Sequence, residues 1–399
     1  MIITMNKTRT RFAPSPTGYM HIGNLRTALF EFLIAKHEGG DFLLRIEDTD
    51  QERKVEGAVD VIYKTLKECG LNWDEGPDIG GDFGPYVQSE RLPMYKGYAE
   101  DLIKLGGAHY CFCSEEEIEA QRKEAESLGI SFKFNDPCKH LSAEEVQAKL
   151  DAGEPYVIRQ TIKDVGETYF DDEVYGRIEV DGDVLDEQIL IKSDGYPTYN
   201  FANIIDDHQM QISHVVRGNE YLSSTPKYNL IYDAYGWQRP TYVHVPPVMK
   251  DEHHKLSKRN GDASFQDLVA KGYLPDAIMN YIALLGWAPE TEQEIYTLDE
   301  LIKVFNIHRI SKSPAIFDID KLTWMNGVYL RNMDEETYYE TVRPYLEKAV
   351  HGAYNLKEIA KIIQPRIDIL NQIEESVDFF DTLVAVSYTH LTLPTTSRV

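Results

Sequence analysis

Two short segments, far apart in the 399-residue chain, carry the residue types best suited to phosphate chemistry. The first covers residues 11–25 and reads RFAPSPTGYMHIGNL, and the second covers residues 255–259 and reads KLSKR. An imidazole such as His21 can donate to a phosphate oxygen, and a glycine such as Gly23 lets a flat base approach the backbone. The basic segment could stabilise a leaving pyrophosphate. Taken separately, the two segments also fit a buried histidine at a helix start and a solvated basic loop.

The sequence around His21 predicts a strand, a loop and then a helix. A buried strand ends at Phe12 and Ala13, and two prolines with Gly18 prevent regular structure in the loop that follows. Apolar residues then recur at helical spacing from about Asn24 to the glycine pair at 39–40, where a left-handed cap is sterically free. A helix N-terminus at the carboxyl edge of a parallel sheet presents N–H groups to solvent. The segment therefore predicts an anion site.

Two further strands are predicted to end in a charged residue at the same edge of the sheet. The apolar strand 42–46 is followed by Glu47, and the strand 214–217 ends in Arg217. A guanidinium here can hold a carboxylate through two parallel hydrogen bonds, which a lysine cannot reproduce. Arg217 and Arg11 are therefore candidates for binding substrate carboxylates, whereas Glu47 on the sequence alone could equally be a surface acid. Strands that alternate with helices predict an α/β fold with a doubly wound parallel sheet.

Three of the four cysteines and one histidine form two close pairs. Cys111 and Cys113 are separated by one residue, and Cys138 and His140 repeat that spacing further along the chain. Two such pairs fit a tetrahedral Cys3His zinc site, which has no open position for catalysis and would be structural. The alternative is three reduced thiols with a surface histidine. The fourth cysteine, Cys69, falls in the last turn of a predicted helix and fits a core thiol better than a ligand.

The formal net charge of −25 disfavours a nucleic-acid partner unless the charges are segregated. Segment 171–187 has eight carboxylates and one arginine, whereas segment 239–259 has five basic residues. We therefore expect a local basic stripe, and binding that weakens steeply with salt. No run approaches the roughly 18 apolar residues that span a bilayer, and no charged-then-apolar leader precedes residue 12. These features predict a cytoplasmic protein that does not bind membranes.

Together the motifs resemble those of the class I aminoacyl-tRNA synthetases. FAPSPTG before His21, RIEDTD at residues 45–50 and KLSKR narrow the resemblance to bacterial-type glutamyl-tRNA synthetases over about residues 7–386. Glutaminyl enzymes of the related branch normally carry a Glu-Pro-containing segment before the histidine, so PSPTG argues against that branch. The resemblance implies ATP-dependent ligation of L-glutamate to the 3′ end of tRNA-Glu through glutamyl-adenylate, with release of AMP and pyrophosphate. It also implies Mg²⁺ with the ATP and, in many members, a structural Zn²⁺.

The resemblance further implies roles for individual residues. Catalysis would fall to His21, Gly23, Lys255 and Lys258. ATP binding would fall to Thr17, Gly18, His21, Gly23, Asn24 and Lys258. Glutamate binding would fall to Arg11, Ala13, Ser15, Glu47, Tyr199, Asn203 and Arg217, with Glu47 receiving the α-ammonium. Contact with tRNA would fall to Arg53 and Glu220. From spacing alone, Tyr199 and Asn203 are i and i+4 of a helix and could simply belong to a tyrosine-rich core.

The same resemblance implies a division into domains. Residues 1–90 and 190–250 would form a Rossmann-like catalytic domain, and residues 91–189 an inserted α+β acceptor-binding domain with the zinc site. Residues 251–330 would form a mixed stem-contact domain with the KLSKR loop, and residues 331–386 the first part of an α-helical anticodon-binding domain. Residues 387–399 have neither an acid nor a helical period. We expect them to be a truncation tail or cloning scar, with incomplete anticodon recognition as the consequence.

Two other classes of function fit parts of the sequence. A free-standing nucleotidyltransferase could use the same His-Ile-Gly site on a small molecule, but such enzymes are usually shorter and lack the Cys-x-Cys insertion. A nonenzymatic tRNA-binding module could keep the fold without the chemistry, although both signature segments are intact here. The resemblance favours a monomer. The sequence leaves open whether tRNA-Gln is charged as well.

Overall fold

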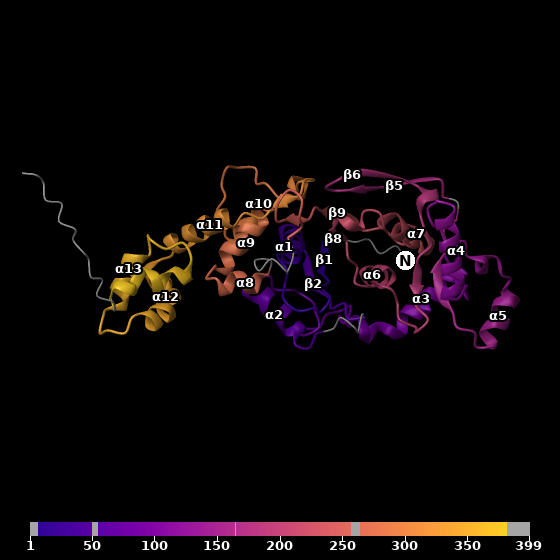
Figure 1. Cartoon of the computed structure of the whole chain (residues 1–399), viewed down its shortest axis with the longest axis horizontal. Helices are drawn as coiled ribbons and strands as arrows, with labels where there is room; N and C mark the ends of the chain where they lie inside the picture. The colour runs from indigo at the N-terminus through magenta and orange to yellow at the C-terminus, as the bar shows by residue number, and fades with distance from the viewer. Residues whose placement is uncertain (1–6, 50–54, 164, 257–263, 381–399) are drawn as a thin grey trace, which may run out of the picture. The chain divides into compact units, whose positions relative to one another are not determined.

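The computed structural model describes residues 7–49, 55–163, 165–256 and 264–380 (Figure 1). The chain divides into two compact units. The first consists of Met1–Asp267 with Met279–Phe317, and the second of Leu268–Ile278 with Asp318–Val399. Within the described ranges, no helix has both the length and the apolar character that a bilayer span requires.

Two parallel strand pairs form the centre of the first unit. β1 (Arg9–Phe12) pairs with β2 (Asp41–Leu44), and β8 (His214–Gly218) pairs with β9 (Thr241–Val245). The two pairs are joined where the backbone N–H of Ser213 donates to the carbonyl of Arg9 at 2.9 Å. The helices of this region are α1 (Ile22–His37), α2 (Ala58–Glu68), α3 (Leu92–Lys104), α6 (Tyr199–Gln209) and α7 (Thr225–Tyr235). Parallel strands connected through helices confirm the predicted α/β fold.

A second, antiparallel sheet carries the cysteine-rich segment. It has the order β3 (Ala108–Cys111), β4 (Val157–Gln160) and β7 (Ile189–Ile191). Two charged helices, α4 (Glu115–Ser127) and α5 (Ala143–Asp151), lie between β3 and β4 in the chain. Both begin with a capping box, in which a serine side chain and the glutamate three residues later satisfy each other's backbone N–H groups.

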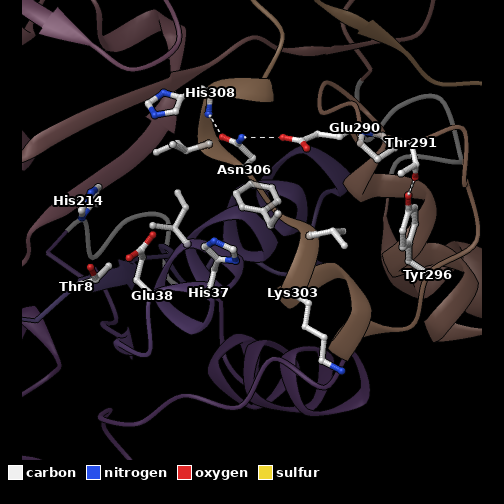
Figure 2. Close-up of a pocket in the computed structure, with 15 residues that line it drawn as sticks. Thr8, His37, Glu38, His214, Glu290, Thr291, Tyr296, Lys303, Asn306 and His308 are labelled. Carbon is white, nitrogen blue, oxygen red and sulfur yellow. Dashed lines mark hydrogen bonds between the residues drawn. The ribbon is translucent and has the colours of Figure 1, made fainter.

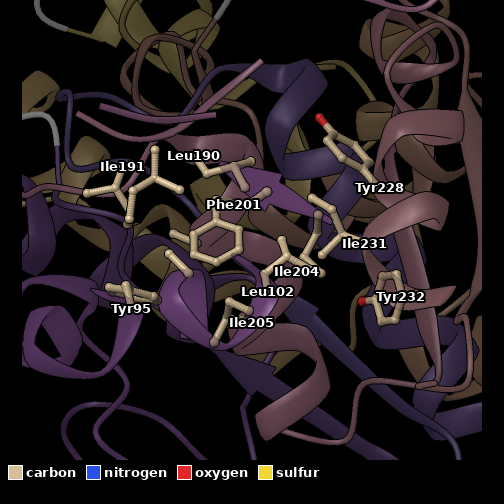
Figure 3. Close-up of a cluster of buried hydrophobic side chains, with 14 residues drawn as sticks. Tyr95, Leu102, Leu190, Ile191, Phe201, Ile204, Ile205, Tyr228, Ile231 and Tyr232 are labelled. Atoms are coloured by element: carbon tan, nitrogen blue, oxygen red, sulfur yellow. The ribbon is translucent and has the colours of Figure 1, made fainter. Parts of the chain in front are cut away.

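One hydrophobic core spans both sides of the predicted boundary at residues 189–190. Tyr95 and Leu102 of α3 and Leu190 of β7 belong to the same buried cluster as Phe201 of α6 and Tyr228 of α7 (Figure 3). These side chains are all less than 2% exposed, so the second sheet and the helices α6 and α7 bury their apolar faces against one another. The division at residues 189–190 stays a prediction.

The hairpin of β5 (Glu167–Asp172) and β6 (Gly176–Asp181) joins the central sheet. β5 runs parallel to β9, where Asp172 pairs with Tyr242, and gives the strand order β6-β5-β9-β8. This hairpin lies within the sequence range predicted for the insertion, yet its strands extend the sheet that contains β8. Asp172 is thereby placed beside Tyr242 and His244 of β9.

Buried charges connect the first strands to α6. Asp207 accepts from Nε of Arg11 at 2.9 Å and from Nη1 of Arg45 at 2.8 Å, and Arg11 also lies 3.2 Å from Glu31. All four side chains are at most 3% exposed. Burial opposes ionisation of Asp207, but the two guanidinium groups outweigh it and lower the pKa of this carboxyl. The network fixes α6, and with it Tyr199 and Asn203, relative to the strands.

We expect Asp207→Asn to lower the free energy of unfolding by about 3–5 kcal/mol, because two buried guanidinium groups lose their shared counter-ion. The folded-state pKa of Asp207 lies below the unfolded value. The stabilisation is therefore full above about pH 4 and is lost as the pH falls through the folded-state pKa. Urea titrations at several pH values measure it. Asp101→Asn, which removes the exposed Asp101–Lys104 pair, is the control and should leave stability nearly unchanged; equal effects of the two variants would contradict the network's role.

The remaining elements lie after the central strands. In the first unit, β10 (Val248–Met249) pairs in parallel with β11 (Ala315–Ile316), and α10 (Leu298–Val304) packs against α1. α8 (Phe265–Ala270) and α9 (Pro275–Ala283) each include residues of both units. The second unit is helical in its described residues, with α11 (Ile319–Asn332), α12 (Glu335–Ala349), α13 (Leu356–Ile363) and α14 (Ile373–Val377) around a core that includes Leu330, Val342 and Ile363.

Candidate active site

The two signature segments meet at His21. This residue is the N-cap of α1, and its Nδ1 accepts from the backbone N–H of Gly23 at 3.0 Å. The neutral ring therefore carries its proton on Nε2, which lies 3.0 Å from the carbonyl oxygen of Leu256. Leu256 is the second residue of KLSKR, so the imidazole holds the start of that segment against the N-terminus of α1. Lys255 is exposed there, and Lys258 lies outside the described residues.

The loop before α1 has the geometry of an anion site. Gly18 has a φ of 108°, a conformation that favours glycine, and Thr17 and Asn24 are exposed on either side of His21. A Cβ at Gly23 would lie 3.2 Å from Nδ1 of His21, so a larger residue there would press on the imidazole. The N-terminus of α1, which His21 caps through the N–H of Gly23, thus lies beside the start of the basic segment, where its further N–H groups could hold phosphate groups.

A second group of predicted residues gathers at the ends of the strands. The guanidinium carbon of Arg217 lies 5.2 Å from the ring centre of Tyr221, and the rings of Tyr221 and Tyr199 are 5.5 Å apart. Burial and the negative charge of Glu47 raise the pKa of Tyr199 well above its ordinary value. Glu47, Tyr199 and Arg217, which are predicted to bind glutamate, therefore lie close together, with Tyr221 beside them; their role toward glutamate stays a prediction.

Glu47 is held next to the loop that contains Ala13 and Ser15. Its backbone N–H donates to the carbonyl of Pro14 at 3.1 Å, and its carboxylate accepts from Nη2 of Arg45 at 3.0 Å. Burial raises the pKa of the Glu47 carboxyl despite this ion pair. Glu47 is 6% exposed, which excludes the alternative of a surface acid. A buried carboxylate whose desolvation outweighs the attraction of Arg45 and Arg11 suits a further cationic partner such as an ammonium group.

Arg11 and Asn203 are both buried but differ in their partners. Nε of Arg11 donates to Asp207 and its Nη1 donates to Glu31, so several of its N–H groups are already bound within the protein. Asn203 is 2% exposed and its amide nitrogen has no hydrogen-bond partner within the described part of the chain. An orphaned buried donor is costly unless a ligand accepts from it. The roles of Arg11 and Asn203 toward the substrate stay predictions.

Of the two residues predicted to contact tRNA, the structure describes one. Glu220 is exposed on the short 3₁₀ turn Asn219–Tyr221, directly after β8, and Arg53 lies outside the described residues. Both roles stay predictions. The tail at 387–399 also lies outside the described residues.

The three predicted cysteine ligands are brought together, but the fourth group beside them is not His140. Cys111, Cys113, Cys138 and Asp136 each place one ligand atom within 4.8 Å of the others, and His140 is exposed outside this group. Asp136 is the N-cap of the 3₁₀ turn Pro137–His140, and its Oδ1 accepts from the backbone N–H of Cys138. Burial raises the pKa of Cys111 to about 11. Three thiols and a carboxylate in this space fit a tetrahedral zinc ion, which would draw the thiols to the thiolate form.

The first unit also contains a cavity of 790 Å³ at the opposite edge of the central sheet (Figure 2). Thr8 and His214 line it at the amino ends of β1 and β8, and His37 and Glu38 line it at the C-terminus of α1. Of the predicted site residues that the structure describes, none lines this cavity. The candidate site lies instead at the carboxyl ends of the strands, as expected for an open α/β sheet.

A family model described as "tRNA synthetases class I (E and Q), catalytic domain" matches residues 7–324. The chain belongs to this family. The glutamate–tRNA ligase of Clostridium botulinum (strain Hall) is 59% identical to this chain over 394 residues, which are 98% of this chain and 81% of that relative. The glutamate–tRNA ligase of Clostridium tetani is 58% identical over 393 residues, which are 98% and 80% of the two chains.

Solved structures agree with this assignment. A glutamate tRNA ligase from Elizabethkingia meningosepticum in complex with its amino acid matches this chain with a TM-score of 0.89 and 37% identity. The match covers 94% of this chain and 80% of the chain of that ligase. The glutamate–tRNA synthetase of Elizabethkingia anophelis has a TM-score of 0.87 and 38% identity. The synthetase therefore has the Rossmann-like fold of its class, and the predicted family is confirmed.

Sequence reasoning missed four residues of the synthetase that the structure places at these sites. The ring of Tyr221 lies near the guanidinium of Arg217, and Asp136 joins the cysteines. Thr225 and His244 each accept a hydrogen bond from Arg217. Asp136 could have been suspected from its place two residues before Cys138. No local pattern marks His244, because its partner is 27 residues away in the chain.

Proposed function

We infer that the protein ligates L-glutamate to the 3′ end of tRNA-Glu in an ATP-dependent reaction. The observation that carries this proposal is the hydrogen bond from His21 to the carbonyl of Leu256, which joins the two motifs that would hold one triphosphate. The buried group of Glu47, Tyr199 and Arg217 provides a matching site for an amino acid with two carboxylates and one ammonium.

The reaction proceeds in two steps. A carboxylate oxygen of glutamate attacks the α-phosphorus of ATP, and the bond to pyrophosphate breaks as glutamyl-adenylate forms. The terminal ribose hydroxyl of the tRNA then attacks the activated carbonyl, and AMP leaves. Lys255 and Lys258 stabilise the charge that builds on the phosphates, while His21 and Gly23 fix the N-terminus of α1 against the start of the basic segment. Mg²⁺ bound to the ATP would neutralise part of that charge. Arg217 binds the side-chain carboxylate, and Glu47 binds the α-ammonium.

Glutamate-dependent exchange of pyrophosphate into ATP tests the proposal. We expect exchange with glutamate and not with glutamine, and only when tRNA is present, as is usual for bacterial-type glutamyl-tRNA synthetases. Exchange without any amino acid, or with glutamine alone, would rule the proposal out. Charging of purified tRNA-Glu and tRNA-Gln side by side measures whether the second tRNA is also a substrate. We further propose that the protein acts as a monomer in the cytoplasm.

The cysteine group would hold a structural zinc ion. Cys111, Cys113 and Cys138 would supply three thiolates, and Asp136 would supply the fourth ligand in place of His140, because its carboxylate lies within 4.8 Å of the sulfur atoms. The ion would join the end of β3 to the turn Pro137–His140 and thereby stabilise the segment that carries α4.

We expect Asp136→Ala and Cys111→Ser to lose bound zinc, and His140→Ala to retain it. Metal content of the purified protein, measured by inductively coupled plasma mass spectrometry, gives the stoichiometry directly. Thermal unfolding with and without a chelator measures the contribution to stability, which should disappear in Asp136→Ala. Loss of zinc in His140→Ala with full zinc in Asp136→Ala would instead support the Cys3His arrangement.

A further inference from the structure

Arg217 is held by the hydrogen bonds that it donates to residues outside the predicted glutamate-binding set. Its Nε donates to Nε2 of His244 at 3.2 Å, and its Nη2 donates to Oγ1 of Thr225 at 2.9 Å. The His244 ring is fully buried, and its Nδ1 lies 2.6 Å from Oδ2 of Asp172. We propose that His244, fixed by Asp172, is a positioning residue that orients the guanidinium of Arg217 toward the side-chain carboxylate of glutamate. This inference rests on the proposed function.

The strand register explains why these residues meet. β8 and β9 run in parallel with Arg217 directly opposite His244, so both side chains lie on the same face of the sheet. β5 joins β9 at Asp172, which places the carboxylate at the other side of the imidazole. The three residues therefore form a row across neighbouring strands.

The directions of the hydrogen bonds are fixed by Asp172. Its Oδ1 accepts from the backbone N–H groups of Val174 and Tyr175 at 3.0 and 2.8 Å, and its Oδ2 accepts from the backbone N–H of His244 at 3.1 Å. A carboxylate surrounded by donors leaves the imidazole Nδ1 to donate as well. The lone pair of His244 then lies on Nε2, facing Nε of Arg217. Burial lowers the pKa of His244, which keeps the ring neutral and able to accept.

Thr225 fixes a second nitrogen of the guanidinium. The hydroxyl of Thr225 donates to the carbonyl of Tyr221 at 2.9 Å, so its oxygen is left to accept from Nη2 of Arg217. The ring of Tyr228 lies 4.7 Å from the guanidinium carbon and restricts its plane. The outer N–H groups on Nη1 and Nη2 then form the fork that a carboxylate accepts bidentately. A guanidinium rotated out of this plane would keep only one of the two bonds.

Asp172→Asn tests the proposal with a side chain of almost the same shape. With its oxygen kept on the N–H groups of Val174 and Tyr175, the amide turns its NH2 toward Nδ1 and toward the backbone N–H of His244. This arrangement favours the other tautomer of His244, with the proton on Nε2, which cannot accept from Arg217. We expect the KM for glutamate to rise by about 10-fold or more, with the KM for ATP and kcat changed by less than about threefold. Nitrogen NMR of labelled histidine should show the proton moving from Nδ1 to Nε2. A moved proton with an unchanged KM for glutamate would overturn the proposal.

Two further variants keep the test independent of how well Asp172→Asn folds. Thr225→Val removes the acceptor of Nη2 and should also raise the KM for glutamate. His244→Gln places an amide oxygen where it can accept from Arg217, and should keep the KM for glutamate closer to wild type than Asp172→Asn does. An unchanged KM in Thr225→Val, or a KM in His244→Gln as high as that of Asp172→Asn, would contradict positioning by these groups.

The matched control is His214→Leu. His214 begins the strand that carries Arg217, and its half-buried imidazole bonds to Oγ of Ser213 at 2.9 Å, away from the candidate site. Its KM for glutamate should stay at the wild-type value; a rise equal to that of Asp172→Asn would assign the effect to general disturbance of β8. Arg217→Gln separates the glutamate-site assignment from the positioning role of His244. If Arg217→Gln leaves the KM for glutamate unchanged, the assignment of the glutamate site fails. If Arg217→Gln raises this KM but Asp172→Asn and Thr225→Val do not, only the positioning role fails.

Discussion

His21→Ala should lower the rate of glutamyl-adenylate formation by about 10²–10³-fold, which corresponds to about 2.7–4 kcal/mol of lost transition-state stabilisation. The imidazole has two tasks in the structure, since its Nδ1 caps α1 and its Nε2 holds the backbone at Leu256. Neither atom contacts the group around Arg217, so the affinity for glutamate should hardly change. Pyrophosphate exchange measures the first quantity, and isothermal titration with glutamate measures the second.

His37→Ala is the matched control for this experiment. His37 ends the helix that His21 begins, and its Nδ1 also bonds to a distant backbone carbonyl, that of Ile302, at 2.8 Å. It lies at the other edge of the sheet and should leave exchange close to wild type. A similar loss in both variants would show that α1 has been destabilised. A large loss of glutamate affinity with unchanged turnover in His21→Ala would contradict the placement of His21 at the ATP site.

Arg217→Gln should weaken glutamate binding by about 2–5 kcal/mol, a factor of about 30 or more, because the side-chain carboxylate would lose its charged, bidentate partner in a buried site. Arg217 is 6% exposed and its guanidinium lies against Tyr221, Tyr228 and Tyr242, so water cannot easily replace it. The KM for ATP should change little. Exchange kinetics at varied glutamate and varied ATP measure the two constants separately.

The same variant tests discrimination between substrates. Glutamine presents a neutral amide, so removal of the guanidinium should affect glutamine far less than glutamate and narrow the ratio of their kcat/KM values. Arg239→Gln is the control, because Arg239 pairs with Asp233 on the exposed side of the end of α7. An unchanged ratio in Arg217→Gln would show that another group selects the side-chain carboxylate.

Local patterns in the sequence were sufficient for much of the fold and for the class of site. Helical spacing and the glycine pair predicted where α1 begins and ends to within a few residues. The ends of the predicted strands placed Glu47 and Arg217 at one edge of the central sheet. These predictions succeed because a helix and a strand depend on neighbours in the chain, and because parallel strands present their carboxyl ends together. Cysteine spacing likewise predicted that Cys111, Cys113 and Cys138 lie together, and the structure places their sulfur atoms in one group that could hold a metal ion.

Contacts between distant segments were decided only by the tertiary structure. His21 reaches a carbonyl 235 residues away, and His244 meets Asp172 across 72 residues, although neither pairing has a sequence pattern. Asp136 instead of His140 stands beside the cysteines because the carboxylate that caps a short turn points inward, while the histidine at the end of that turn is exposed. The sequence by itself therefore determined which residue types stand at the ends of the strands. Strand register and turn geometry, which depend on packing between remote segments, decided which of them touch.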